Sequence, residues 1–182
     1  QERESQWKPL AADKDATYDR SLEIDLAEIE PLAAAPHSPG NITKVGDLDL
    51  PVDQVMIGSC TNSSYVDLMT VARMVRGKKL PEGISLGIAP GSRQVLNAIA
   101  KNGALSDLIG FGARILESSC GFCIGNSMSP CTDSVSVRTS NRNFMGRSGT
   151  PSANVYLTSP VVAAAAALTG RLTDPRELDM EF

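Results

Sequence analysis

Histidine, cysteine and long apolar runs are all scarce in this sequence, and each shortage excludes a class of protein. His37 is the only histidine, which leaves few ways to build the closed four-ligand site that a structural zinc ion requires. Four cysteines in 182 residues are too few for the disulfide framework of a small secreted domain. The most apolar stretch, residues 161–168, is far too short to span a bilayer.

Excess positive charge is also missing. The formal net charge of −4 gives no general electrostatic attraction to nucleic acid or to an anionic membrane, so neither is an expected partner. The amino end is polar and lacks the apolar run of a secretory signal, so we predict a cytoplasmic location. Because the chain begins with Gln1 and reads like the interior of a longer sequence, we expect it to be part of a larger polypeptide.

The composition is that of an ordinary globular protein, with 42% hydrophobic and 21% charged residues. We predict two parts, an extended lead-in over residues 1–43 and an α/β domain over residues 44–182. In the lead-in, apolar residues alternate with charged ones, which predicts one half-buried strand at Leu22, Ile24 and Leu26. Proline and glycine then predict a stiff, extended loop, from positions 31, 36, 39 and 40. The lead-in cannot form its own core, so we expect it to dock against another part of the protein.

From about residue 44, short apolar runs alternate with amphipathic stretches. The runs predict five strands, at 55–57, 84–89, 113–116, 135–137 and 155–157. Residues 105–109 predict a helical turn, and three longer helices are expected after Ser64, Ser92 and Ser159. This alternation predicts an α/β fold with three α/β/α layers, in which helices cover both faces of a mainly parallel sheet.

Chemically active residues follow the carboxyl ends of these predicted strands. Cys60 follows the first strand, and the pair Cys120 and Cys123 follows the third. Asn141 and Arg142 follow the fourth strand. In an open parallel sheet those ends lie along one edge, where ligands bind. We therefore expect the three segments to meet in space and to form one site.

The thiols alone leave several kinds of site open. Cys120 and Cys123 form a Cys-x-x-Cys pair, which suits a redox dithiol, half a zinc site, two ligands of an iron–sulfur cluster or two buried thiols. A redox dithiol would not need Cys60, and a zinc site would need a fourth ligand. Three thiolates suit an iron–sulfur cluster with one iron left uncapped, which can bind a substrate oxygen. For Cys131, a packed free thiol is as good an interpretation as any functional role.

The arginines near residue 142 suggest an anion beside the thiols. Arg142 and Arg147 lie among asparagines and Gly146, at a predicted strand end. A guanidinium binds a carboxylate through two parallel hydrogen bonds, so a polycarboxylate is the natural ligand. The alternative is a loop held together by bonds from arginine to backbone carbonyls.

Three motifs together resemble the signatures of the aconitase superfamily, and the resemblance extends over most of the chain from about residue 18. They are Gly-Ser-Cys-Thr-Asn-Ser at 58–63, Cys-Gly-Phe-Cys-Ile-Gly at 120–125 and Ser-Asn-Arg-Asn-Phe-Met-Gly-Arg at 140–147. The resemblance implies an aconitase-like cluster-binding domain. It also implies that three cysteines bind a [4Fe–4S] cluster, namely Cys60, Cys120 and Cys123. Arg142 and Arg147 would hold substrate carboxylates, and Asn141 would lie beside the cluster.

The resemblance also implies an activity for the parent protein. Cys-Gly-Phe-Cys resembles the aconitase branch more than the isopropylmalate isomerase branch, which often has Cys-Ser-Met-Cys. We therefore predict a hydro-lyase of the tricarboxylic acid cycle, an aconitate hydratase that isomerises citrate and isocitrate through cis-aconitate. The alternative enzyme is the large subunit of a 3-isopropylmalate dehydratase or a homoaconitase.

Members of the superfamily have further domains, and the resemblance identifies this chain with the third of them. Two upstream domains supply the catalytic His and Asp residues, and a swivelling domain, fused or on a small subunit, supplies a serine base. By this resemblance, none of the catalytic bases lies in this chain, and the missing domains are its expected partners. The non-enzyme alternative is a cluster-binding or RNA-binding module that is inactive in isolation.

Overall fold

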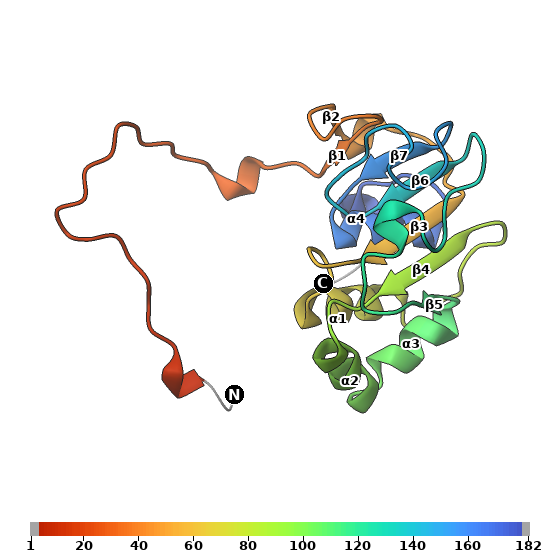
Figure 1. The fold of residues 1–182 in the computed structure, drawn as a ribbon, viewed down its shortest axis with the longest axis horizontal. Coiled ribbons are helices and arrows are strands. Elements are labelled where there is room, and N and C mark those ends of the chain that lie inside the picture. Colours follow the sequence, from red (N-terminus) through yellow and green to blue (C-terminus); the bar gives the residue numbers. More distant parts are fainter. Residues whose placement is uncertain (1–3, 180–182) are drawn as a thin grey trace.

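The computed structural model describes residues 4–179, which form an α/β body with a long amino-terminal extension (Figure 1). The body is built on one seven-stranded sheet, in the order β2-β1-β7-β6-β3-β4-β5. Its strands are β1 (Leu32–Ala34), β2 (Ile42–Lys44), β3 (Gln54–Gly58), β4 (Ser85–Ala89), β5 (Arg114–Ile115), β6 (Val135–Arg138) and β7 (Asn154–Leu157). The predicted α/β class with a mainly parallel sheet is confirmed.

Five of the strands are parallel, and their register brings their carboxyl ends together. β3 lies at the centre and pairs in parallel with both β4 and β6. β5 extends the sheet from β4, and β7 extends it from β6. β1 and β2 complete the sheet as an antiparallel edge beside β7. All segments that follow the five parallel strands therefore emerge along one edge of the sheet.

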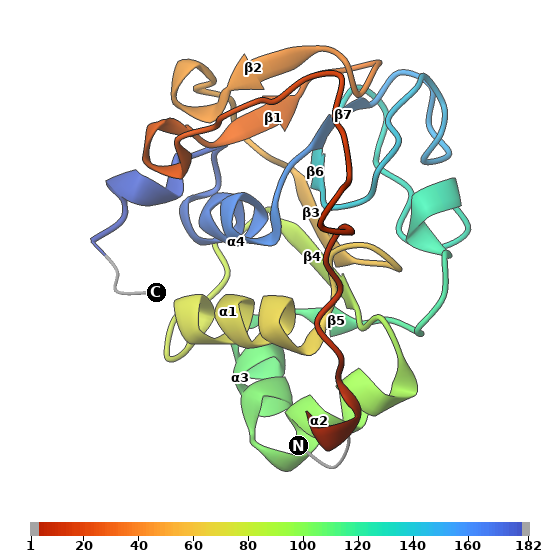
Figure 2. The ribbon, with the colours of Figure 1, turned by 90° about the vertical axis from the view of Figure 1, so that its left-hand side faces the viewer.

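Four α-helices pack on a single face of the sheet (Figure 2). They are α1 (Tyr65–Val75), α2 (Arg93–Lys101), α3 (Ala104–Phe111) and α4 (Pro160–Thr169). Side chains from all four share one core with alternate strand residues such as Val55, Ile57 and Val137. α3 is longer than the single turn that residues 105–109 predicted. α4 consists largely of alanine, which lets it pack closely on the sheet.

The opposite face of the sheet carries no α-helix among the described residues, whereas the sequence predicted helices on both faces. It is covered by the segment that leaves β5, which forms only the short 3-10 helix Phe122–Ile124. Phe122 and Cys123 of this segment pack against Met56 of β3 and Ala89 of β4. A cysteine-bearing loop therefore lies directly on the centre of the sheet.

The lead-in differs from its prediction. Residues 21–25 form no strand, and Leu26–Glu28 is a 3-10 helix capped by Asp25. The three side chains that predicted the strand remain exposed, at Leu22, Ile24 and Leu26. Alternation becomes a strand only where the segment pairs with another strand, and this segment pairs with neither edge of the described sheet, at β2 or at β5. The extension leads away from the sheet, and other large apolar side chains on it are exposed as well, including Trp7 and Leu10 (Figure 1).

Strands β1 and β2 were missed by the sequence analysis. The prolines at 31, 36 and 39 flank these three-residue strands rather than interrupt them. β2 spans the predicted boundary between residues 43 and 44, so the sheet begins inside the lead-in. That domain boundary stays a prediction.

Within residues 4–179, no helix is both long enough and apolar enough to cross a membrane. The cytoplasmic location stays a prediction.

Candidate metal centre and anion site

The first cysteine turn, residues 58–64, leaves the end of β3 at the centre of the sheet. Gly58 has φ 132°, and a Cβ there would lie 2.1 Å from the Ala89 carbonyl oxygen, so only glycine fits. Ser59 continues with φ 71° and donates its backbone N–H to the same carbonyl at 3.2 Å. The turn then presents Cys60 to solvent before Ser64 begins α1. The helix predicted after Ser64 is confirmed, and Ser64 and Asp67 form a capping box at its start.

The cysteine loop, residues 117–131, follows β5 and crosses the helix-free face of the sheet. Cys120 is exposed and accepts a backbone hydrogen bond from Cys123 at 3.1 Å, which closes a tight turn between the two thiols. Cys123 is buried, with 9% of its surface exposed. Gly125 then ends the short helix in the left-handed region, at φ 76°. The four cysteines of the chain are all free thiols.

Three of these thiols gather at the carboxyl edge of the sheet. Cys60 and Cys120 both line a cavity of about 100 Å³, together with Pro90 and Gly91 of the turn after β4. Cys123 is coupled electrostatically to both. Its thiol pKa is raised, chiefly because burial disfavours the thiolate and also because a negative charge on Cys120 or Cys60 would repel it. A hydrogen bond from the Ser59 side chain opposes this shift.

This donor set fits an iron–sulfur cluster better than a single ion. In the part of the chain that the structure describes, no three His, Cys, Asp or Glu side chains are close enough to bind one metal ion. In a cluster each thiolate binds a different iron, so the sulfurs stand farther apart than the ligands of one ion. Two free thiols line the small cavity and a third, Cys123, is near enough to both to interact with them electrostatically, which is the donor composition that such a group needs.

The arginine loop, residues 139–151, follows β6 and lies against both cysteine segments. Thr139 is fully buried and joins it to β3, since the Gly58 N–H donates to the Thr139 hydroxyl at 2.8 Å. The side-chain amide of Asn62 donates to the Thr139 carbonyl at 2.6 Å. The arginine loop also contacts the cysteine loop. A Cβ on Gly125 would lie 2.6 Å from the Cα of Gly149, so the cysteine loop and the arginine loop touch through their backbones. The structure thus brings the three predicted segments together.

The arginine loop holds several buried polar atoms without partners. Arg147 Nε has no hydrogen-bond partner among the described residues, and the same holds for Ser140 Oγ, Asn143 Oδ1 and Ser148 Oγ. The Arg147 guanidinium instead stacks 5.7 Å from the centre of the Phe144 ring. Buried polar atoms are normally satisfied, so four unsatisfied atoms on one loop indicate room for a polar ligand or a partner surface.

Arg142 and Asn141 lie on the exposed part of the same loop. The only hydrogen bond described for the Arg142 side chain is a long one, from Nη1 to the Asn141 carbonyl at 3.4 Å. Its guanidinium is therefore available to a ligand. Neither residue is among the described residues that line the cavity between Cys60 and Cys120, and their roles beside a cluster stay predictions.

Cys131 lies elsewhere. It lines a cavity of about 180 Å³ with Gln54 and Ser85, the first residues of β3 and β4. This cavity is at the amino ends of the strands, opposite the edge that carries the other thiols. A packed free thiol remains a sufficient interpretation of Cys131.

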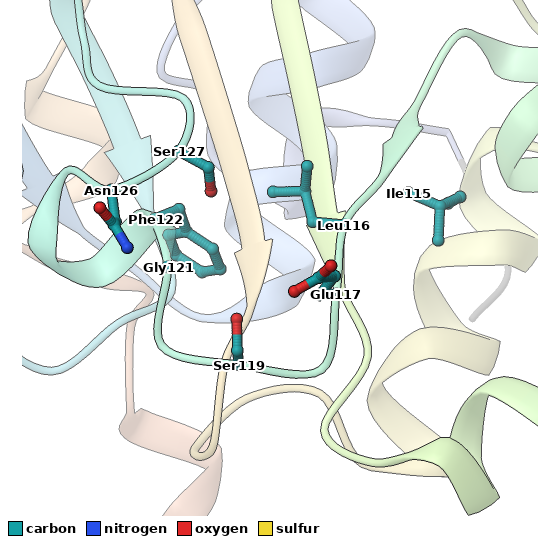
Figure 3. Close-up of a pocket in the computed structure, with 8 residues that line it drawn as sticks. All are labelled: Ile115, Leu116, Glu117, Ser119, Gly121, Phe122, Asn126 and Ser127. Carbon is teal, nitrogen blue, oxygen red and sulfur yellow. The ribbon is translucent and has the colours of Figure 1, made fainter.

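A larger cavity borders the cysteine loop on the side toward β5 (Figure 3). It has a volume of about 390 Å³, and its lining includes Glu117, Ser119 and Asn126 from the loop. Figure 3 shows the Phe122 ring turned toward the sheet, where it is 1% exposed. The side chain between the two cysteines therefore packs the core and does not face the cavity between Cys60 and Cys120.

One residue of the site was missed entirely. Arg138 of β6 is fully buried beneath the cysteine loop and contacts Gln54 and Ser136 on the same face of the sheet. The sequence contained a signal for it, because polar residues alternate with valines in β6 and because Gln54 opens a central strand. Polar residues on one face of a buried strand indicate a polar network beneath the loop that covers it.

Comparison with known proteins identifies the family of this chain. Residues 47–170 match the family described as "Aconitase family (aconitate hydratase)". The chain is 42% identical to the "3-isopropylmalate dehydratase large subunit" of Clostridium beijerinckii over 172 residues, which cover 93% of this chain and 41% of the relative. It is 41% identical to "3-isopropylmalate dehydratase large subunit 1" of Methanopyrus kandleri over 174 residues, covering 94% and 42% of the two chains. The "3-isopropylmalate dehydratase large subunit" of Clostridioides difficile is 42% identical over 170 residues, which cover 92% of this chain and 40% of the relative.

The chain thus spans about two fifths of the length of these relatives. The family match contains every predicted site residue, namely Cys60, Cys120, Cys123, Asn141, Arg142 and Arg147. Because the match covers more than half of the chain, the chain belongs to the aconitase family.

Proposed function

We propose that this chain is the cluster-binding part of a hydro-lyase large subunit that acts on a hydroxy acid related to 3-isopropylmalate. The observation that carries this proposal is the meeting of three free thiols with an arginine loop at the carboxyl edge of one parallel sheet. Thiolates and guanidiniums are the groups that hold an iron–sulfur cluster and a carboxylate, respectively.

In this proposal Cys60, Cys120 and Cys123 hold a [4Fe–4S] cluster through three of its irons. When bound, such a cluster supplies an uncapped iron that acts as a Lewis acid on the hydroxyl that leaves the substrate. Arg142 binds a substrate carboxylate from the exposed part of the arginine loop, and Arg147 supports it from the half-buried part. Fixing the acid through its carboxylates orients it for both dehydration and rehydration.

The relatives support the isopropylmalate branch, which was the alternative prediction, over the aconitate hydratase. The prediction depended on Cys-Gly-Phe-Cys. Phe122 of that motif is buried against Met56 and Ala89, so packing against the sheet determines which residue fits at this position. A residue that faces the core has no direct means of selecting the acid.

The partners follow from the same reasoning. Three similar proteins are named as large subunits, and this chain covers about two fifths of each. We therefore propose that further parts of the same polypeptide and a separate small subunit complete the active site. The unsatisfied polar atoms of the arginine loop, including Ser140 Oγ and Arg147 Nε, support a partner surface or a ligand there.

Substrate competition on the full-length parent, assembled with its small subunit and loaded with iron and sulfide, tests this proposal. We expect turnover of 3-isopropylmalate, with citrate and homocitrate used at least about tenfold less well, since one differing substituent contributes about 1–3 kcal/mol to discrimination. A clear preference for citrate would restore the aconitate hydratase prediction. No turnover of any of these acids would refute the hydro-lyase proposal.

A further inference from the structure

Arg138 is the largest fully buried side chain among the described residues, and each of its three guanidinium nitrogens donates a hydrogen bond. Nε donates to Ser136 Oγ at 2.9 Å, and one Nη2 bond goes to Gln54 Oε1 at 2.7 Å. Nη1 donates to the Phe122 carbonyl at 2.6 Å, and Nη2 also donates to the Met128 carbonyl at 2.9 Å. The first two bonds anchor the guanidinium to strands β3 and β6, and the other two reach the cysteine loop.

The two loop carbonyls lie on either side of Cys123. Phe122 precedes it directly, and Met128 lies five positions after it. The guanidinium plane therefore fastens the loop to the sheet at two points, with the Phe122 ring 5.8 Å from the guanidinium carbon. Gln54 of β3 supports one of these two points, since its Nε2 donates to the carbonyls of Met128 and Ser129. Among the hydrogen bonds described for residues 4–179, those of Arg138 alone join a side chain of the sheet to both points.

The charge of Arg138 has no carboxylate partner among the described residues. Burial lowers its pKa to about 10, so the guanidinium is still a cation at neutral pH. Cys123 is the one group whose negative charge, as a thiolate, would act on it. A buried ion is costly unless it is paired, and apolar residues of similar volume often replace buried ions without loss of stability. A role in packing alone therefore does not explain an arginine at this position.

We propose that Arg138 is a positioning residue that fixes the Cys123 thiol toward the other two cysteines and balances the negative charge of a group bound there. This inference rests on the proposed function, because the bound group is the cluster assigned above. Two separable effects follow. The fork of hydrogen bonds sets the place of the loop, and the positive charge sets the electrostatic potential at the cluster.

Variants on β6 separate these effects from general destabilisation. Arg138→Met keeps a similar length but removes both the charge and the fork, and Arg138→Lys keeps the charge alone. Val137→Ala is the matched control, since Val137 is a fully buried neighbour on the same strand whose side chain faces the helices. The three variants and the wild type are made in the full-length parent, and circular dichroism checks that each is folded.

The first measurement is the rate at which a maleimide labels Cys123 in the iron-free protein, followed by mass spectrometry of the Cys123 peptide. We expect labelling to accelerate at least about tenfold in Arg138→Met and in Arg138→Lys, because each loses buried hydrogen bonds that hold the loop against the sheet. Val137→Ala should label at the wild-type rate. An unchanged rate in both Arg138 variants, or an equal acceleration in Val137→Ala, would overturn the positioning role.

The second measurement is the midpoint potential of the iron-loaded protein. Reduction adds negative charge, so the loss of a nearby cation in Arg138→Met should shift the potential to more negative values. Arg138→Lys should shift it less, and Val137→Ala should leave it unchanged. A wild-type potential in Arg138→Met would overturn the charge-balancing role. A wild-type protein that takes up no iron would instead refute the proposed function, and the labelling rates would then decide the positioning role alone.

Discussion

Among single residues, burial separates two arginines that stand four positions apart. Arg138 is fully buried, and each of its guanidinium nitrogens donates to the protein. Arg142 is exposed, and its side chain makes one long bond to a neighbouring carbonyl. An arginine with free donors can hydrogen-bond a substrate, whereas one whose nitrogens already donate to the protein acts through its place and its charge. The two residues therefore call for different tests.

Replacing Arg142 by lysine in the full-length parent should lower kcat/KM by about 10- to 150-fold, the equivalent of about 1.5–3 kcal/mol for a charge-assisted hydrogen bond. The reason is that an ammonium group cannot reproduce the two parallel bonds that a guanidinium makes to a carboxylate. Steady-state kinetics measures the change, with Arg73→Lys on the exposed side of α1 as the control. Wild-type kinetics in Arg142→Lys would contradict the binding role and would indicate that Arg142 only stabilises the conformation of the arginine loop.

Thr139→Val should lower the free energy of unfolding by about 1–3 kcal/mol, because the buried Gly58 N–H loses its acceptor. Urea denaturation measures this loss. Thr70→Val is the control, since the Thr70 hydroxyl bonds within the exposed side of α1 and a change there should be within about 0.5 kcal/mol. A loss of stability in Thr139→Val no larger than in Thr70→Val would show that the hydrogen bond between the arginine loop and the first cysteine turn contributes little to stability.

At the level of elements, the five parallel strands could be predicted because each is a short apolar run bounded by turn residues. Their carboxyl ends then placed Cys60, Cys120 and Arg142 at one edge. The strand at Leu22 could not be judged in this way, since whether alternation becomes a strand depends on a free edge elsewhere in the molecule. The face of the sheet on which each helix lies could not be predicted either. The apolar periodicity of a helix shows which of its sides is buried but not which face of the sheet it covers.

Some of the site was hidden from the sequence for a related reason. Motifs reveal residues whose type is unusual for their position, such as Cys60 in a turn. Arg138 sits in an ordinary strand, and its role depends on which loop covers it. That loop comes from β5, which is separated from β6 in the sheet by β3 and β4. Contacts between distant segments of this kind emerge only when the fold is known.

The start of α1 gives a test at this scale. Ser64→Ala should lower the free energy of unfolding by about 0.5–2 kcal/mol, because the Asp67 N–H loses the hydroxyl that caps it. Ser64→Gly should cost only a few tenths of a kcal/mol by the same general scale. Thermal unfolding of the two variants measures the difference. An equal loss in both would indicate that the cap contributes little and that packing fixes the helix start.

For the molecule as a whole, one face of the sheet is packed by helices and the other by the cysteine loop. The chain spans about two fifths of its relatives, and His37 stands in the turn between β1 and β2, on the antiparallel side of the sheet. The proposed site therefore offers candidate ligands for a metal group and for an anion, and the described residues supply no evident general base.

This organisation predicts that the isolated chain, even when loaded with iron and sulfide, does not hydrate cis-aconitate or dehydrate 3-isopropylmalate. An assay by ultraviolet absorbance of the unsaturated acid measures this, with the full-length parent and its small subunit as the positive control. Turnover by the isolated chain near the rate of the control would mean that the proposed further parts are dispensable.

The measurement that tests the central claim most directly is the iron and sulfide content after anaerobic reconstitution of the full-length parent. The wild type and Cys131→Ser should each bind about four irons per chain and show the brown, oxygen-sensitive absorbance of a [4Fe–4S] cluster. Single changes of Cys60, Cys120 or Cys123 to serine should each abolish stable binding, because each removes one of three thiolate ligands. One zinc per chain with no uptake of iron, or loss of iron in Cys131→Ser alone, would contradict the assignment of this edge of the sheet as the metal centre.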